Sequence, residues 1–282
     1  MIIIKIGGGL GNQMFQYALG KKLSIKNSDK FLLDTCDFSK DTDDAQYRKF
    51  GLAHFNITAS IATPDQIESI KKPKIWNFIE RKVFGYKHIK FEPHILKKRG
   101  GVYLDGYFQS EKYFKDIRPN LLDDLSLKEP LSSVGTAILD QIQSRPNTVS
   151  LHVRRGDYVM TKERVKTFGS YCTPEYYYRA LVSLSKKKGA LSVFVFSDDI
   201  EWAKKNLDIA FPVVYITNEC PDYEQLMLMS MCQNHIIANS TFSWWGAWLN
   251  NKPGKIVLAP KQWIVGPNLP IDDILPHEWE RI

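Results

Sequence analysis

Cysteine is scarce and unpaired in this sequence. Four cysteines are spread over 282 residues without a Cys-x-x-Cys spacing, and no histidine stands at zinc-ligand spacing from a cysteine. Neither a disulfide framework nor a zinc site is therefore expected. We interpret the cysteines as reduced thiols of a cytoplasmic protein: Cys36, Cys172, Cys220 and Cys232.

Long hydrophobic runs are also missing. No stretch approaches the roughly 18 apolar residues of a membrane-spanning helix. The opening MIIIKIGGG contains a short apolar run but lacks the basic segment and the cleavage site of a signal peptide. The sequence therefore predicts neither secretion nor a transmembrane segment.

Two common nucleotide-binding motifs are incomplete or absent. In the glycine-rich turn GGGLGNQ (residues 7–13), the third glycine of Gly-x-Gly-x-x-Gly would fall on Asn12 or Met14. Asp34 does supply the acidic residue expected about 20 positions further on, so an NAD-dependent oxidoreductase stays an alternative. No glycine is followed by Lys-Ser or Lys-Thr in the frame of a P-loop.

Positive charge is in excess. The formal net charge is +7 and the isoelectric point is about 9.0, which suggests an anionic partner such as a nucleotide, a nucleic acid or a membrane surface. Lysines cluster at residues 71–74, 97–99 and 186–188, and a solvated surface is the simplest interpretation. Nucleic-acid binding is disfavoured because the aromatic residues are not interleaved with these clusters.

The chain reads as two α/β halves. Residues 2–6 predict a buried strand, and the glycine turn leads into a helix and then a second strand at 30–34, a βαβ unit. After residue 148, apolar runs alternate with helices that begin near Pro174, Ile200, Tyr223 and Ser243. The runs cover residues 149–153, 191–197, 213–217, 235–239 and 255–259. Such alternation predicts a parallel, doubly wound sheet. We expect two Rossmann-like domains, 1–135 and 136–282.

Polar residues follow three of the predicted strands in the second half. Because the carboxyl ends of parallel strands share one edge, these residues should meet there. They are His152, Arg154, Arg155 and Asp157 after one strand, Asp198 and Asp199 after the next, and Asn239, Ser240, Thr241, Phe242 and Ser243 between a later strand and a helix.

This combination fits a nucleoside diphosphate. Arginine presents a fork of donors that matches phosphate oxygens, and a helix N-terminus attracts the same anion. An aspartate at the neighbouring strand end can accept hydrogen bonds from guanine or ribose.

Each feature also has a simpler interpretation. Arg155 and Asp157 can form an ion pair, His152 can be a core residue, and Asp199 can be a helix N-cap. We interpret the tryptophans of SWWGAW as core packing. The conjunction at successive strand ends is more specific than any one of its members.

Four segments, GGGLGNQMFQYA, HVRRGDY, SDDIEWAK and NSTFSWWGAWLN, occur in this order along essentially the whole chain. Together they resemble the bacterial alpha-1,2-fucosyltransferases. The wider superfamily, with alpha-1,6- and protein O-fucosyltransferases, shares the His-x-Arg-Arg pattern. The resemblance implies a GT-B-like architecture, with two Rossmann-like domains facing across a cleft. It also implies GDP-beta-L-fucose as donor, inversion at the anomeric carbon, and no metal or other cofactor.

The resemblance also implies roles for single residues. Arg154 would bind the beta-phosphate, and Arg155 would order the site or assist the same charge. We expect Arg154, Arg155 and Asp157 to form the catalytic set. His152 and Asp199 would contact guanosine, and Ser240 to Ser243 would cap the pyrophosphate. The N-terminal domain, on the acceptor side, would reach the cleft through Gly9, Gly11, Asn12 and Gln13.

The acceptor implied by the resemblance is a terminal galactose on a surface glycan such as an O-antigen. If the glycan is lipid-linked, the basic patches could hold the protein to the inner face of an anionic membrane. The residue that deprotonates the acceptor stays open between Asp157, Asp34 and Asp105, and an oxocarbenium-like transition state could make a strong base unnecessary. Asp-Thr-Asp at 41–43 has the form of a metal-binding Asp-x-Asp, but we interpret it as a solvated loop because no strand precedes it.

Overall fold

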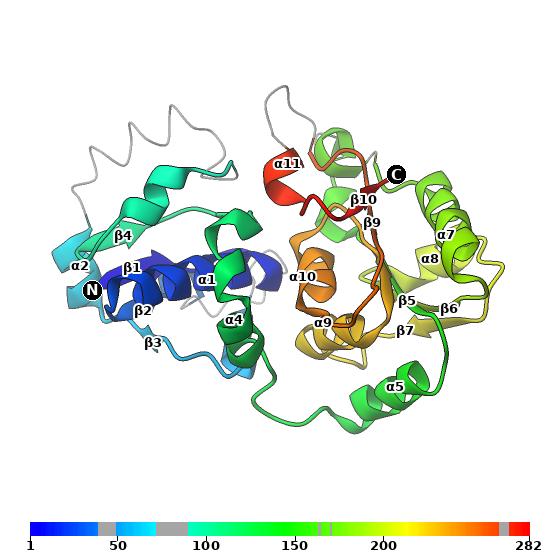
Figure 1. Ribbon diagram of the computed structural model, residues 1–282, viewed down its shortest axis with the longest axis horizontal. Helices are drawn as coiled ribbons and strands as arrows, with labels where there is room; N and C mark the ends of the chain where they lie inside the picture. Colours follow the sequence, from blue (N-terminus) through cyan, green and yellow to red (C-terminus); the bar gives the residue numbers. More distant parts are fainter. Residues whose placement is uncertain (39–48, 72–89, 163–164, 170, 265–270) are drawn as a thin grey trace. The chain divides into compact units, whose positions relative to one another are not determined.

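The computed structural model describes residues 1–38, 49–71, 90–162, 165–169, 171–264 and 271–282. They form two compact units, the first made of residues 1–128 and 272–274 and the second of residues 129–271 and 275–282 (Figure 1). The boundary expected after residue 135 falls inside helix α5 (Ser133–Gln143). This helix packs on the second sheet through Ile138 and Ile142, and therefore belongs wholly to the second unit.

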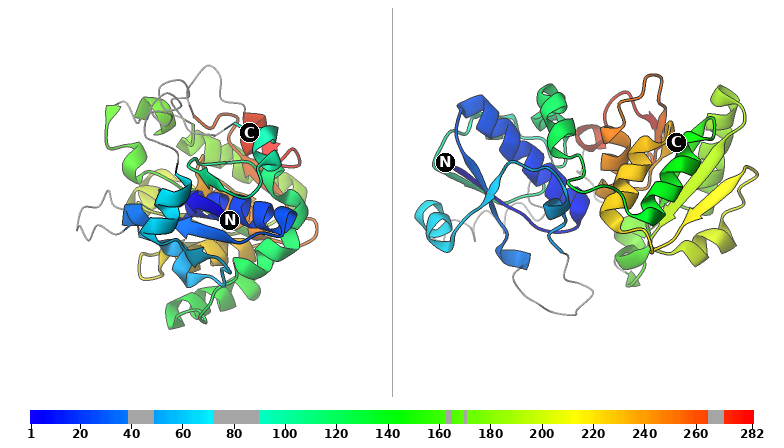
Figure 2. Two further views of the ribbon diagram at one scale, coloured as in Figure 1. Left: turned by 90° about the vertical axis from the view of Figure 1, so that its left-hand side faces the viewer. Right: turned by 90° about the horizontal axis from the view of Figure 1, so that it is seen from below.

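The first unit contains a four-stranded parallel sheet with the order β3-β2-β1-β4. Alternate residues of the β-branched first strand face opposite sides of this sheet. Ile3 packs with Ile67 of helix α2, whereas Ile4 lies near Gly20 of the long helix α1. Figure 2 shows the ribbon from two further sides. The strands are β1 (Ile2–Lys5), β2 (Phe31–Asp34), β3 (Ser60–Ile61) and β4 (Val102–Leu104), and the helices are α1 (Leu10–Asn27), α2 (Pro64–Ile70), α4 (Arg118–Asp124) and α11 (Ile271–Ile274).

The second unit contains a six-stranded parallel sheet with the order β10-β9-β8-β5-β6-β7. Numbered within the unit, this is the doubly wound order 3-2-1-4-5-6, in which the direction of winding reverses between β5 and β8. The strands are β5 (Thr148–Val153), β6 (Ser192–Ser197), β7 (Val213–Ile216), β8 (Asn234–Ile236), β9 (Val257–Ala259) and β10 (Glu280–Arg281), and the remaining helices are α7 (Pro174–Lys188), α8 (Ile200–Asn206), α9 (Asp222–Met231) and α10 (Thr241–Leu249).

Both faces of this sheet are apolar, as the continuous hydrophobic runs of the sequence predict. Val193 and Val195 of β6 pack toward α7 and α8, and the alternate residues Phe194 and Phe196 pack toward α5 and α9. The α/β class is therefore confirmed, and all five strands predicted after residue 148 are present. In the described part of the chain, no helix has the length and apolarity needed to cross a membrane.

Candidate functional site

The order of the second sheet brings the predicted strand ends together. β5 lies between β6 and β8, and Val153 at its end is in register with Ser197 at the end of β6. The chain leaves β5 and β8 in opposite winding directions, and ligands of doubly wound sheets bind in the crevice at such a point. The residues after β5, β6 and β8 therefore share one edge, as the sequence predicted.

Arg154 and Asp198 form an ion pair across this edge. The Nη1 atom of Arg154 is 2.6 Å from Oδ2 of Asp198, and the other oxygen, Oδ1, accepts a hydrogen bond from the backbone N–H of Arg155 at 2.9 Å. Only 20% of the Arg154 side chain and 27% of the Asp198 side chain are exposed, so solvent screens this pair less than a fully exposed one. The carboxylate thus holds both a guanidinium and the backbone of the next residue.

Arg155 has a carboxylate of its own. Its Nε atom is 3.1 Å from Oδ2 of Asp199, and its guanidinium carbon lies 4.0 Å from the centre of the Trp202 ring. Asp199 is also the N-cap of α8, because Oδ1 accepts from the backbone N–H of Trp202 at 3.1 Å. The helix-cap interpretation of Asp199 is therefore confirmed, and it coexists with an ion pair that the sequence did not predict.

Two neighbouring guanidinium groups are thus each matched by a carboxylate. The formal charge of Arg154, Arg155, Asp198 and Asp199 together is zero, so the arginines are neutralised before any ligand arrives. Arg155 pairs with Asp199, and the suggested pair of Arg155 with Asp157 involves a side chain outside the described part of the structure. The backbone of Asp157 lies in the short turn Gly156–Tyr158.

His152 is buried with an unsatisfied nitrogen. The residue is 5% exposed, and its Nδ1 atom has no hydrogen-bond partner among the described residues. Burial, with a smaller effect from the positive charge of Arg154, lowers the pKa of His152 to about 3, so the ring is neutral at pH 7. The ring of Phe242, a residue of α10, lies 5.6 Å from the His152 ring, measured between the ring centroids. A buried polar atom without a partner is uncommon and is typical of a site completed by a ligand.

The first turn of α10 follows β8 and therefore lies at this edge. Ser240 is the N-cap, and its hydroxyl oxygen accepts from the backbone N–H of Phe242 at 3.3 Å. Thr241 and Phe242 are partly exposed. The hydroxyl of Ser243 instead turns inward, where the backbone oxygens of Ser240 and Ala238 lie 3.3 and 3.5 Å away. The partly exposed Thr241 can therefore present donors to an anion, whereas the hydroxyls of Ser240 and Ser243 stabilise the turn.

Asn239 was predicted to bind the donor with its side chain, and the structure gives that side chain an internal role. It is 2% exposed, its Nδ2 donates to the backbone oxygen of Trp263 at 2.9 Å, and its Oδ1 accepts from Sγ of Cys172 at 3.4 Å. Its backbone oxygen accepts from the hydroxyl of Tyr158 at 3.1 Å. Asn239 therefore links the segments that contain Trp263, Cys172 and Tyr158 and supports the strand-end site.

Only some residues of the glycine turn in the first unit are accessible to solvent. Gln13 is fully buried, donates to the backbone oxygens of Gly8 (2.9 Å) and Lys49 (2.8 Å), and accepts from the N–H of Gly51 (2.9 Å). The Gln13 amide, which was predicted to reach a cleft, forms hydrogen bonds here that join two segments of the unit. Gly11 is likewise buried in the first turn of α1.

Asn12 and Gly9 remain partly exposed at the start of α1. Asn12 accepts a hydrogen bond from Nε2 of Gln109 at 2.8 Å. Gly8 before them adopts φ +76°, and a Cβ atom there would lie 2.8 Å from Nδ2 of Asn12. Gly8 is thus required by its left-handed backbone and by close packing, whereas a Cβ atom on Gly9 would meet nothing within 4 Å.

The three candidate bases differ in their surroundings. Asp34 is 2% exposed and accepts hydrogen bonds from the Tyr103 hydroxyl (2.6 Å) and the Cys36 N–H (3.0 Å). Burial opposes its charged form, but these hydrogen bonds outweigh it and hold the pKa of Asp34 below its usual value. Each oxygen of Asp34 thus already accepts one hydrogen bond. Asp105 follows β4 and is half-buried.

Sequence reasoning missed Gly156, Tyr158 and Trp202. The guanidinium carbon of Arg154 lies 5.5 Å from the centre of the Tyr158 ring, so each arginine has an aromatic neighbour. The available signals were an aromatic residue soon after the arginine pair and another three positions after Asp199. Among the described residues, no group of three or more His, Cys, Asp or Glu side chains is arranged to hold a metal ion. The Asp-Thr-Asp motif at 41–43 lies outside the described residues.

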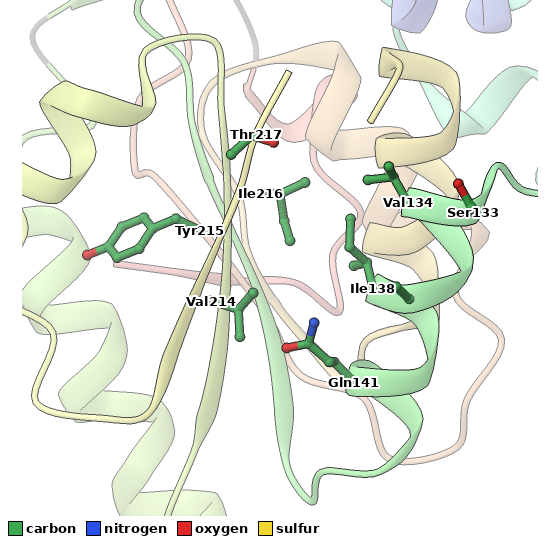
Figure 3. A pocket seen from close by; sticks show the side chains of 9 residues that line it. Ser133, Val134, Ile138, Gln141, Val214, Tyr215, Ile216 and Thr217 are labelled. Carbon is green, nitrogen blue, oxygen red and sulfur yellow. The ribbon is translucent and has the colours of Figure 1, made fainter. Parts of the chain in front are cut away.

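A hollow of about 400 Å³ lies elsewhere in the second unit, between α5 and β7 (Figure 3). Ile138 and Ile216 face each other in it, whereas Tyr215 points away from α5. None of the residues predicted for the strand-end site lines this hollow.

Comparison with known proteins decides the family. The model of Glycosyl transferase family 11 matches residues 1–282. The chain belongs to this family. An alpha-1,2-colitosyltransferase of Escherichia coli is 34% identical over 299 residues, covering 100% of this chain and 99% of the relative. The O-antigen biosynthesis glycosyltransferase WbnK of Escherichia coli is 34% identical over 295 residues, covering 93% of this chain and 95% of the relative.

The fold of this family 11 glycosyltransferase has a counterpart among solved structures. NodZ alpha-1,6-fucosyltransferase, soaked with GDP-fucose, matches with a TM-score of 0.52 and 14% identity, covering 88% of this chain and 92% of NodZ. The predicted GT-B-like class is thus confirmed. Membership of a glycosyltransferase family over the whole chain also removes the oxidoreductase and nucleic-acid-binding alternatives.

Proposed function

We propose that this glycosyltransferase moves L-fucose from GDP-beta-L-fucose to the 2-hydroxyl of a terminal galactose, with inversion and without a metal. The observation that carries the proposal is the strand-end site of the second unit. Arg154 and Arg155 follow β5 at the point where winding reverses, beside the start of α10 and the unsatisfied Nδ1 of His152. A diphosphate and a base or ribose are ligands that such a set can bind.

The chemistry follows from where charge develops. Breaking the bond between fucose and the diphosphate builds negative charge on the GDP leaving group. Fixed cationic and N–H donors stabilise that charge best where water is partly excluded, and Arg154 is mostly buried. In the proposal, Arg154 and the first turn of α10 face the diphosphate, and neutral His152 contacts the guanosine. Asp157 and Asp105 remain the candidate bases, because each oxygen of Asp34 already accepts a hydrogen bond.

Colitose is the second candidate sugar. The full-length relative at 34% identity is named for colitosyl transfer, with the same 1,2 linkage as the proposed reaction. Colitose lacks the hydroxyl that fucose carries at C3. A comparison of the two donors therefore tests whether the enzyme requires this hydroxyl. The acceptor proposed is a galactose-terminated, lipid-linked or free glycan of the O-antigen type, in line with the name of the second relative.

The test is GDP release from GDP-fucose and from GDP-colitose, each with a panel of galactose-terminated acceptors and with EDTA present. Arg154→Ala should lower the rate roughly 100- to 1000-fold, the usual cost of removing one charge-stabilising donor. Arg179→Ala is the matched control, because Arg179 is 52% exposed on α7, where its Nε atom lies 4.0 Å from a carboxylate oxygen of Glu175.

Acceptor-dependent release in EDTA from GDP-fucose would support the proposal. Faster turnover of GDP-colitose would mean that the donor sugar is colitose instead of fucose, and it would leave the proposed binding site unchanged. Loss of activity in EDTA that added Mg²⁺ restores would contradict metal independence. If the protein neither binds GDP nor turns over either donor, the proposed site is wrong.

We also propose peripheral binding to anionic membranes through the lysine clusters. Vesicles with and without anionic lipid test this in a co-sedimentation assay. Equal sedimentation with both kinds of vesicle would contradict it.

A further inference from the structure

Asp198 contacts the β5 strand end at two points. Asp198 is the first residue after β6. The last residue of β6, Ser197, is in register with Val153, the last residue of β5. One carboxylate oxygen pairs with the Arg154 guanidinium at 2.6 Å, and the other accepts the Arg155 backbone N–H at 2.9 Å. A single carboxylate therefore fixes both the direction of one side chain and the path of the backbone after it.

Gly156 makes room for this carboxylate. A Cβ atom built on Gly156 would lie 2.4 Å from Oδ2 of Asp198 and 3.6 Å from the guanidinium carbon of Arg154. No side chain fits there without moving the ion pair. The sequence Arg-Arg-Gly thus places a residue without a side chain where the chain passes closest to Asp198.

The ion pair with Asp198 is compatible with a ligand contact, because a guanidinium has five N–H donors and this pair uses one terminal nitrogen. Asp199 serves Arg155 in a different way, because its side chain is 40% exposed and also caps α8. The two acidic residues, which the sequence treated as one donor-binding pair, have separate roles.

We infer that Asp198 is a positioning residue that acts on the donor diphosphate through Arg154, instead of contacting the nucleotide itself. This inference rests on the proposed function. It makes Asp198 a determinant of phosphate recognition and of leaving-group stabilisation. Binding of the nucleoside portion is independent of Asp198.

The experiment compares the affinities of GDP, GMP and guanosine for the wild type, Asp198→Ala and Asp198→Asn. The alanine variant should weaken GDP binding about 10- to 100-fold, the loss expected for a misplaced charge-assisted contact. Guanosine affinity should change less than about twofold. The asparagine variant keeps an acceptor for the Arg155 N–H but loses the negative charge, so it should keep the fold and still lose the GDP preference. Asp208→Asn, exposed between α8 and β7, is the charge-matched control.

Two further variants test whether Asp198 acts through Arg154. Gly156→Ala displaces the carboxylate without removing a charge and should reproduce the selective loss of GDP affinity. In an Arg154→Ala background, Asp198→Ala should have almost no additional effect on GDP affinity, because the group that it orients is gone. A direct contact of Asp198 with the nucleotide would instead make the two losses additive.

The outcomes separate this inference from the proposed function. If wild type does not bind GDP, both fall. If wild type binds GDP and the Asp198 variants bind it equally well, only the inference is overturned. If GDP and guanosine affinities fall together in a folded Asp198→Asn variant, Asp198 contacts the nucleoside and the inference is overturned. A loss confined to the phosphorylated ligands, and absent without Arg154, supports it.

Discussion

The guanidinium of Arg155 is held between two groups from the same turn of helix α8. Its central carbon lies 4.0 Å from the centre of the Trp202 ring, and its Nε atom lies 3.1 Å from Oδ2 of Asp199. Because Asp199 caps the helix in which Trp202 is the third residue, the beginning of α8 sets both the charge and the surface that Arg155 contacts. The orientation of this arginine is therefore encoded in the segment after β6.

Replacing Trp202 with Leu should weaken GDP binding modestly. A partly exposed cation–π contact contributes about 0.5–1 kcal/mol, which corresponds to roughly a two- to fivefold change in affinity. Trp202→Phe keeps an aromatic face and should lie between the leucine variant and the wild type. Calorimetric titration with GDP measures the effect. An unchanged affinity in Trp202→Leu would show that Arg155 does not depend on the ring.

Gln13→Ala should destabilise the first unit and leave nucleotide binding unchanged. The substitution removes one acceptor and two donated hydrogen bonds from a fully buried position, so the Gly51 N–H and two backbone oxygens lose their partner. Each unsatisfied buried group costs about 1–3 kcal/mol. Faster hydrogen exchange of the α1 amides would report the loss. A fall in GDP affinity with normal exchange would instead restore the role in the cleft that the sequence suggested.

The strand-end site was predictable because sheet topology enforces it. Once residues 149–153 and 191–197 are recognised as neighbouring parallel strands, Arg154 and Asp198 must follow them at one edge. The direction of each side chain at that edge was not predictable. Whether Asp199 points at a ligand or at Arg155 depends on the start of α8, and nothing in the sequence alone distinguishes these cases.

Two buried amides have hydrogen-bond partners that the sequence did not predict. Gln13 and Asn239 are polar residues beside a glycine turn and a strand end, where a ligand contact is a reasonable expectation. Both are satisfied by backbone groups distant in sequence, at Lys49 and Gly51 for Gln13 and at Trp263 for Asn239. Such pairings appear only after the chain folds. β10 also escaped prediction, because two residues carry no detectable periodicity.

Glu224→Ala should destabilise the second unit by about 2–4 kcal/mol. Glu224 is 3% exposed and accepts hydrogen bonds from the backbone N–H (3.0 Å) and the hydroxyl (2.7 Å) of Ser132, the N-cap of α5. Its removal leaves these donors unpaired and opens a cavity. Urea unfolding followed by tryptophan fluorescence measures the change, and Glu224→Gln, which keeps one acceptor, should cost less. Equal stability of wild type and alanine variant would contradict this anchoring of α5.

Two buried histidines predict how stability depends on pH. His235 is fully buried, with Nδ1 2.7 Å from the Ser150 hydroxyl and Nε2 2.7 Å from Nδ2 of Asn250. The Asn250 amide is oriented by its bonds to the Cys232 oxygen and the Lys252 N–H, so its nitrogen donates to Nε2 and the proton of His235 lies on Nδ1. Burial first, then nearby lysines, lowers the pKa of His235 well below 6.5. His152 is lowered to about 3.

Both histidines are therefore neutral in the folded protein under conditions where the unfolded chain already binds protons. The free energy of unfolding should be constant above pH 6.5 and fall as the pH drops below it. Each histidine contributes up to about 1.4 kcal/mol per pH unit, or about 2 kcal/mol between pH 6.5 and 5. The hydrogen-bonded carboxyl of Asp34 has a pKa below 3.8, so its protonation lowers the free energy of unfolding only at more acidic pH. The window from pH 6.5 to 4.5 thus belongs to the histidines.

His235→Gln should roughly halve the slope of stability against pH in this window, although its stability at pH 7 will also be lower. Urea unfolding at several pH values, followed by the tryptophans of the second unit, gives the slope. His277→Gln is the control, because the His277 side chain is 88% exposed and should leave the slope unchanged. A flat profile between pH 6.5 and 5 in the wild type would mean that His152 and His235 accept protons in the folded state, and that the buried network around His235 rearranges to hold a charge.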